Sequence, residues 1–178
     1  MLETIVCCLL NSIFVNVLNL YGGNESGPGN WAIQELGACD VEYPSDLYLS
    51  RQEVNSTADV FDGILNLPDG IDDSFSVTLK YNRLDGGADE RATSETYSQF
   101  IYRYTKNTDQ GQCHEASETY PFYYPIPPDE YQFSDYVYSY KDYQLPTEGI
   151  YGTYRVRSYL VQGQNTVGCT QITISFTE

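Results

Sequence analysis

The only histidine of the chain, His114, directly follows Cys113 and is the first candidate for nucleophilic chemistry. A serine or cysteine nucleophile needs a base that lies beside it in space. Adjacent residues of a strand point to opposite faces, so this pair does not predict a Cys-His dyad. One histidine with scattered cysteines also lacks the composition of an ordinary zinc site. We therefore expect neither a metal site nor a cofactor.

Carboxylates are the second candidates, because paired acids can catalyse glycoside hydrolysis or bind calcium. They cluster with glycine at Asp69–Asp73 and at Asp85–Glu90. Neither cluster has the spacing of an EF-hand loop, and both lie where turns are expected. We interpret them as Asp/Gly turns, with calcium binding as the alternative. The number of acids leaves a glycosidase-type pair open, but we predict that the protein is not an enzyme.

The charge balance excludes one class of partner. The chain of 178 residues has 25 Asp and Glu against 9 Lys and Arg, a formal net charge of −16. Nucleic-acid binding needs clustered basic side chains and is therefore not expected. Simple adsorption to anionic membranes is disfavoured for the same reason. The 18 tyrosines and the low charged fraction indicate one folded domain with a substantial core.

An apolar run at residues 5–20 predicts a secretory signal peptide over residues 1–22, ending at the small residues Gly22 and Gly23. The run is too short and too polar for a membrane span, since three asparagines interrupt it. A buried helix or strand of the mature fold is the alternative, because Glu3 and the lack of Lys or Arg depart from the signal pattern. Removal of the segment would discard Cys7 and Cys8.

Residues 23–30 are rich in Gly, Asn, Ser and Pro and predict a flexible leader before a single domain at 31–178. Two glycosylation sequons, at Asn24 and Asn55, are meaningful only in an exported chain. They give weak support to secretion.

From residue 47 onward, strand-length runs alternate with turn residues, and no long helical period is visible. The clearest run is Ser74–Arg83, where apolar and polar residues alternate. Residues 95–105 are expected to form a strand with Phe100 and Tyr102 on one side. Further strands are expected at Leu47–Val54, Asp59–Leu67 and Tyr131–Leu145. This spacing predicts a two-sheet antiparallel β-sandwich.

The chain ends in a predicted hairpin around the loop Gln162–Asn165. Before the loop, Tyr154, Val156 and Leu160 share one face, and Arg155 and Arg157 share the other. After the loop, the apolar residues again share one face: Ile172, Ile174 and Phe176. Both strands are therefore expected to pack on one side and to meet water on the other.

This stretch resembles the end of proteins of the ML (lipid-recognition) domain family, in particular the ganglioside activators. The matching residues are Leu145, Pro146, Gly152, Tyr154, Arg155, Val156, Ser158, Leu160, Gly168 and Cys169. Upstream, Trp31 followed by Cys39 and Asp40 resembles the opening of the same family. Cys113 and His114 resemble a Cys-His-Cys stretch that here lacks its second cysteine. The resemblance is dense over about a fifth of the chain.

The resemblance implies an immunoglobulin-like sandwich or β-cup with an apolar cavity between its sheets. It implies a secreted or lysosomal lipid carrier that contacts membranes transiently and presents a glycolipid to a lysosomal glycosidase. It also implies a disulfide between Cys39 and Cys169. Cys113 would then be a buried thiol, an intermolecular bridge or half of another pair. Glu148 stands where the family has an exposed apolar residue, and three of four family disulfides are missing, so the carrier fold is better supported than the hydrolase-activating role.

Apolar side chains of the expected inward faces are our candidates for the lipid-binding cavity. They are Phe75, Val77, Leu79, Phe100, Tyr102, Val156, Leu160, Ile172, Ile174 and Phe176. Aromatic and branched residues near Pro-rich or Gly-rich loops are candidates for a cavity lip that touches membranes: Phe122, Tyr123, Tyr124, Ile126, Ile150 and Tyr151. The Tyr-rich run at 136–143 fits either a surface strand or a pocket wall. The alternative function is an adhesion module with a closed core that contacts glycans or proteins through exposed tyrosines.

Overall fold

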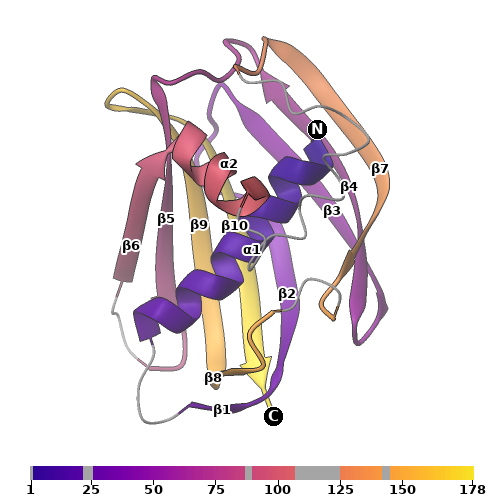
Figure 1. The fold of residues 1–178 in the computed structure, drawn as a ribbon. Coiled ribbons are helices and arrows are strands. Elements are labelled where there is room, and N and C mark those ends of the chain that lie inside the picture. Colours follow the sequence, from indigo (N-terminus) through magenta and orange to yellow (C-terminus); the bar gives the residue numbers. More distant parts are fainter. Residues whose placement is uncertain (1, 22–25, 87–89, 107–124, 142–144) are drawn as a thin grey trace.

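The computed structural model describes residues 2–21, 26–86, 90–106, 125–141 and 145–178, without the side chains of Leu2, Thr4, Leu18, Asp46 and residues 102–106. Within these residues the chain forms antiparallel sheets with two helices beside them (Figure 1). The predicted β-sandwich is confirmed at this level.

The larger sheet has five strands in the order β2-β10-β9-β5-β6. Their bounds are β2 Asn30–Ala38, β10 Asn165–Thr177, β9 Gly152–Gln162, β5 Phe75–Arg83 and β6 Glu90–Thr96. In β5 every second side chain is buried, as the alternation predicts. The hairpin of β9 and β10 turns at Gly163, whose φ of 62° favours glycine. The predicted final hairpin is therefore confirmed.

The smaller sheet has three strands in the order β3-β4-β7. Their bounds are β3 Asp46–Asn55, β4 Ala58–Leu67 and β7 Asp129–Ser139. On β4 the buried residues include Phe61, Leu65 and Leu67, which alternate with exposed ones. Tyr48 and Ile64 are paired in register and exposed, so they lie on the opposite face of this sheet.

A short two-stranded sheet pairs β1, Ser26–Pro28, with β8, Glu148–Ile150. Ser26 lies opposite Ile150, and Gly29 N donates to Thr147 O at 3.0 Å. Residues 26–28 therefore do not form the unstructured leader that their composition predicts. Backbone pairing to a distant segment orders them instead.

The strand predicted at residues 95–105 is wrong for most of its length. Strand β6 ends at Thr96, and helix α2 follows at Tyr97–Lys106. Tyr97, Phe100 and Ile101 are buried together, which is the i, i+3, i+4 spacing of a helix face. Thr96 begins the helix, since its Oγ1 accepts a hydrogen bond from Gln99 N at 3.3 Å.

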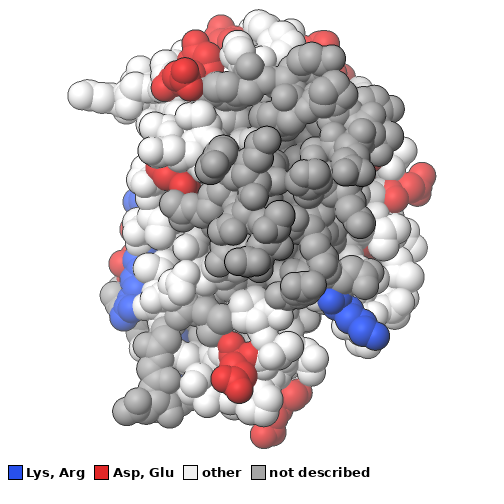
Figure 2. All heavy atoms as spheres, in the orientation of Figure 1, with Lys and Arg blue, Asp and Glu red and all other residues white. Residues whose placement is uncertain are grey.

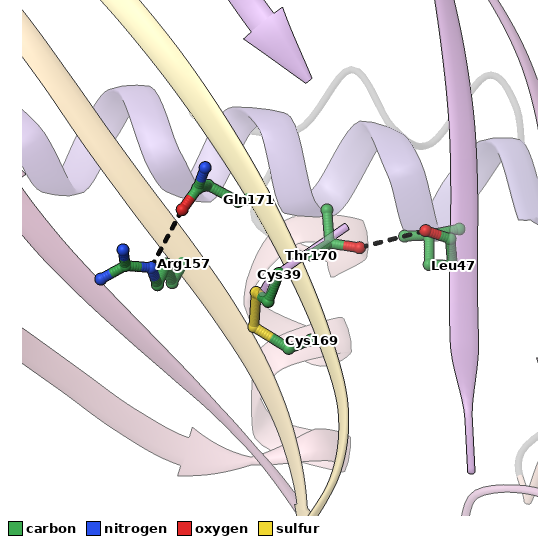
Figure 3. Close-up of a disulfide and its surroundings, with 6 residues drawn as sticks. All are labelled: Cys39, Leu47, Arg157, Cys169, Thr170 and Gln171. Atoms are coloured by element: carbon green, nitrogen blue, oxygen red, sulfur yellow. Dashed lines mark hydrogen bonds between the residues drawn. A yellow bond between two sulfur atoms is a disulfide. The ribbon is translucent and has the colours of Figure 1, made fainter. Parts of the chain in front are cut away.

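The predicted disulfide between Cys39 and Cys169 is present (Figure 3). It links the end of β2 to β10 across a sequence separation of 130, with the two Cα atoms 5.7 Å apart. Next to it, Thr170 Oγ1 donates to Leu47 O at 3.3 Å (Figure 3). That bond joins the five-stranded sheet to β3 of the smaller sheet.

The N-terminal run forms one long helix, α1, at Leu2–Tyr21. It crosses the inner side of the five-stranded sheet diagonally and passes beside the three-stranded sheet (Figure 1). Its buried residues form part of the hydrophobic core. Among the described residues, no helix has both the length and the hydropathy required to cross a membrane.

Candidate functional site

The two sheets meet along one edge and diverge from there. Strand β3 lies against β2 and β10 at the closed edge, where Ser45 N donates to Val167 O at 2.8 Å. Away from this edge, α1 lies between the sheets (Figure 1). The ring of Phe14 is 5.2 Å from Trp31 of the larger sheet and 6.4 Å from Tyr138 of the smaller one. We call the space between the sheets that α1 fills the groove.

Most of the residues predicted to line a cavity are buried on the inward side of the larger sheet. They are Phe75, Val77, Leu79, Val156, Ile172, Ile174 and Phe176. Phe100 is buried too, but it comes from α2 instead of a strand. Leu160 is partly buried and lines a small pocket near the disulfide. The side chain of Tyr102 lies outside the described residues.

The helix contributes an equally apolar surface to the groove. Its buried apolar side chains are Ile5, Val6, Cys7, Cys8, Leu9, Leu10, Ile13, Phe14, Val17 and Tyr21. Burial of one large aliphatic or aromatic side chain stabilises a fold by about 1.5–3 kcal/mol. If water filled the groove, the apolar side chains of both the helix and the sheets would lose this stabilisation. The sheet faces therefore need an apolar group between them.

The polar groups of α1 also find partners in the groove. Tyr138 Oη donates to Asn11 Oδ1 at 2.8 Å, and neither residue is exposed by more than 2%. Tyr21 Oη donates to Tyr81 O at 2.9 Å. Ser12 Oγ donates to Leu9 O within the helix at 2.8 Å. These bonds explain why a run interrupted by polar residues can be buried here without a large desolvation penalty.

The two cysteines of α1 are in different states. Cys7 is disulfide-bonded. Cys8 is a free thiol with no exposed surface. Burial raises the pKa of the Cys8 thiol to about 12, so it stays protonated and unreactive at neutral pH.

A buried polar cluster lies at the end of the groove and ties the sheets together. Asp59 on β4 has no exposed surface, and its Oδ2 lies 2.9 Å from Arg51 Nε on β3. Tyr140 donates a hydrogen bond to the same Asp59 oxygen and accepts one from Ile33 N of β2 at 3.0 Å. Burial, and then the bond to Asp59, raises the pKa of Tyr140. Sequence reasoning missed this cluster, because each residue lies in an ordinary strand or turn.

With α1 in place, little empty space remains in the groove. One apolar pocket of about 80 Å³ lies between the N-terminal half of α1 and the sheets. Its lining includes Ile5, Leu9, Val77, Phe100 and Leu160. Ligand pockets usually measure roughly 300–1,000 Å³. The pocket alone is therefore too small for a lipid.

The other predicted site residues are placed as follows. Ile126 is buried and forms a bridge with Ile71, and Ile150 is buried in β8. Tyr151 stacks on Phe176 with ring centroids 5.7 Å apart, and its hydroxyl donates to Pro28 O. Ile126 and Ile150 are therefore buried in this structure, and Tyr151 is partly buried, whereas a cavity lip that touches membranes would expose them. Phe122, Tyr123, Tyr124, Cys113, His114 and Asn24 lie outside the described residues.

Asn55 ends β3 and is exposed, and its Oδ1 accepts hydrogen bonds from Thr57 in the following turn. Asp72 accepts a hydrogen bond from Ser74 N in its own turn at 2.9 Å, whereas Asp85 accepts one from Thr153 N of β9 at 2.8 Å. Within the described ranges, no group of three or more His, Cys, Asp or Glu side chains is placed to hold a metal ion.

No protein-family model matches the chain, and no curated protein matches it.

Proposed function

We propose that the protein binds a lipid in the groove between its two sheets, the space that α1 fills in this structure. One observation carries the proposal. Away from the closed edge, helix α1 lies between the apolar inward faces of the sheets, and its Phe14 contacts both. A protein whose core were closed by its strands alone would not leave room for a helix.

The groove has the size that a lipid requires. A helix of 20 residues is roughly 30 Å long and 10 Å wide. The space that it would vacate exceeds the volume of an ordinary ligand pocket. Each methylene of an acyl chain that entered the groove would contribute about 0.8 kcal/mol of transfer free energy. Binding alone is the activity, and it requires no catalytic residue.

The proposal has α1 leave the groove when residues 1–22 are removed as a secretory signal. The disulfide Cys39–Cys169 does not involve α1, so the domain keeps this link after cleavage. Such a disulfide is typical of secreted proteins and of oxidising compartments. The exposed sequon at Asn55 is accessible to glycosylation. These features support secretion or delivery to the lysosome.

One polar group of the groove would face the ligand. The hydroxyl of Tyr138 donates to Asn11 in this structure and would need a new acceptor once α1 is gone. An ester or amide carbonyl of an acyl lipid can accept that bond. We limit the proposal to binding and carriage. Glu148 is exposed at the start of β8, where the resemblance to ML domain proteins implies an exposed apolar residue.

The test is secretion of the full chain from a eukaryotic cell, followed by N-terminal sequencing and native mass spectrometry of the product. We expect an N-terminus near residue 23 and a lipid mass that is lost on denaturation. A product that lacks α1 and carries no lipid, before or after incubation with mixed lipid vesicles, would refute the proposal.

A matched pair of substitutions locates the lipid. Val77 points into the groove and Thr78 points away from it on the same strand. Val77→Trp would fill part of the vacated space and is expected to reduce the amount of bound lipid strongly. Thr78→Trp adds the same side chain outside the groove and should leave it unchanged. Equal lipid content in both variants would place the ligand elsewhere.

A second candidate function is a binding module with a permanently closed core. The disulfide-bonded state of Cys7 and the buried bond between Tyr138 and Asn11 favour it, because both would hold α1 in place. Contacts to a partner would then use exposed residues such as Tyr48 and Val137 on the smaller sheet. A secreted product that begins near residue 1 and carries no lipid would select this function.

A further inference from the structure

The outer face of the larger sheet differs in charge from the rest of the molecule. We define the outer face as the side of β5, β9 and β10 that points away from α1. These three strands contain no Asp or Glu, although the chain has 25 of them, and they contain four of its 9 Lys and Arg. The opposite side of the molecule shows acidic side chains at several places around its rim (Figure 2).

Three of the cations lie together on the outer face. Lys80 of β5 is directly opposite Arg157 of β9 in register, and Arg155 follows two residues away on the same side. Directly opposed residues on antiparallel strands have Cα atoms about 4.5–5.5 Å apart, and Arg155 and Arg157 are about 7 Å apart along the strand. Like charges in direct opposition destabilise a sheet, so an anion between them would be favourable.

Two polar groups of this face lack partners among the described residues. Arg155 Nε and Thr173 Oγ1 are both buried without a hydrogen-bond partner, and the two residues are directly opposite in register. Thr173 is only 5% exposed. Its neighbours are satisfied: Arg157 Nε donates to Gln171 Oε1 at 3.0 Å (Figure 3), and Lys80 Nζ lies 3.3 Å from Glu90. Buried polar atoms are nearly always paired, so the unused hydrogen-bonding capacity of Arg155 and Thr173 is unusual. Both atoms are covered in this structure, so a ligand reaches them when the covering side chains move aside.

Acidic residues bound the face on both sides and limit the size of that ligand. Glu90 on β6 pairs with Asn82, and Glu35 on β2 pairs with Thr173. The two glutamates are four strand spacings apart, about 19 Å. A membrane or a long polyanion would meet both of them and the net charge of −16. A compact anion fits between them.

We infer that the outer face binds a short acidic saccharide, with one carboxylate on Arg155 and Thr173. The planar guanidinium matches a carboxylate in geometry, and the hydroxyl of Thr173 adds a donor. The amides of Gln171 and Asn82 and the ring of Tyr159 lie on the same side and suit the hydroxyls and flat faces of sugars. This inference goes beyond the lipid-binding proposal and does not depend on it, since α1 lies on the other side of the sheet.

Titration of the purified full-length protein with hyaluronan disaccharide tests the inference, with neutral chitobiose as the ligand control. At low ionic strength we expect saturable binding of the acidic disaccharide and at least tenfold weaker binding of chitobiose. Arg155→Gln should weaken binding of the acidic disaccharide by at least tenfold. Thr173→Val, which keeps shape but removes the hydroxyl, should weaken it severalfold without lowering the melting temperature.

Lys141→Gln is the matched control, because it makes the same charge change at an exposed position outside this face. It should leave the affinity unchanged. Equal losses in Lys141→Gln and Arg155→Gln would reduce the effect to net charge and overturn the inference. Inorganic sulfate that binds as tightly as the disaccharide would also overturn the inference. Binding of phosphatidylserine vesicles without binding of the disaccharide would overturn it too.

Discussion

Asp59 has no exposed surface, and its carboxylate lies between a guanidinium and a phenol from other parts of the fold. Asp59→Asn keeps the size of the side chain but removes the charge that faces Arg51. A buried ion pair that loses one partner leaves the other charge uncompensated, at a cost of about 3–5 kcal/mol. We expect a loss of about 3 kcal/mol in the free energy of unfolding, because Arg51 is 18% exposed. Urea denaturation measures it.

Glu53→Gln is the control for this substitution. Glu53 also pairs with Arg51, at 3.6 Å, but its side chain is 65% exposed. Exposed ion pairs contribute less than about 1 kcal/mol. Two variants with equal effects would contradict the importance of the buried pair between Arg51 and Asp59 for the stability of the fold.

The disulfide between Cys39 and Cys169 closes a loop of 130 residues. In the chain-entropy model, a loop of this length contributes up to about 5 kcal/mol, and measured values are often smaller. The double variant Cys39→Ser, Cys169→Ser should therefore melt well below the wild-type protein. Reductant should lower the melting temperature of the wild type toward that of the variant. An unchanged melting temperature in the variant would show that the bridge does not stabilise the fold.

At the level of elements, the rate at which the Cys8 thiol reacts reports whether helix α1 lies in the groove. Burial raises the pKa of this thiol to about 12, so at pH 8 it is nearly all protonated while α1 lies in the groove. We expect maleimide to label Cys8 at least a hundredfold more slowly in the folded full-length chain than in urea. Unfolding in urea speeds the labelling, because the thiolate fraction and the access rise together. Fast labelling of the folded chain would show that α1 does not reside in the groove.

The strands were predictable because their signal is local. Alternation in β5 and in the final hairpin directly reports which face is buried, and the turn around Gly163 follows from its residue types. Helix α2 was not predicted, because its tyrosines and isoleucine also suit strands. Yet the spacing of Tyr97, Phe100 and Ile101 contained the helical period.

The candidate site was predictable only in part, because it depends on where α1 lies. Sequence patterns identify the inward faces that form its walls, and the disulfide pairing came from the family resemblance. The pairing of Asn11 with Tyr138 joins residues 127 positions apart, and no local pattern indicates it. No local pattern indicates the hydrogen bond between Asp59 and Tyr140 either, because Asp59 lies on β4 and Tyr140 follows the end of β7.

At the level of the whole molecule, the net negative charge destabilises the folded state. The formal charge of −16 makes the surface repel itself, because 25 Asp and Glu residues face only 9 Lys and Arg residues. At 0.1 M salt the Debye length is about 10 Å, so repulsion between exposed charges farther apart than this is largely screened. Sodium chloride between 10 and 200 mM should therefore raise the melting temperature by a few degrees. For a chain of this size each kcal/mol corresponds to about 2–4 °C.

Two comparisons isolate this electrostatic effect. Sorbitol at the same osmolality changes solvation without screening charge, so it should raise the melting temperature less. At pH 4.5 part of the carboxylates is protonated and the negative charge is smaller, so the gain from salt should shrink. A melting temperature that falls with salt at pH 7 would mean that attractive pairs outweigh the repulsion. In that case the stability of the protein would depend on ion pairs such as that between Lys80 and Glu90.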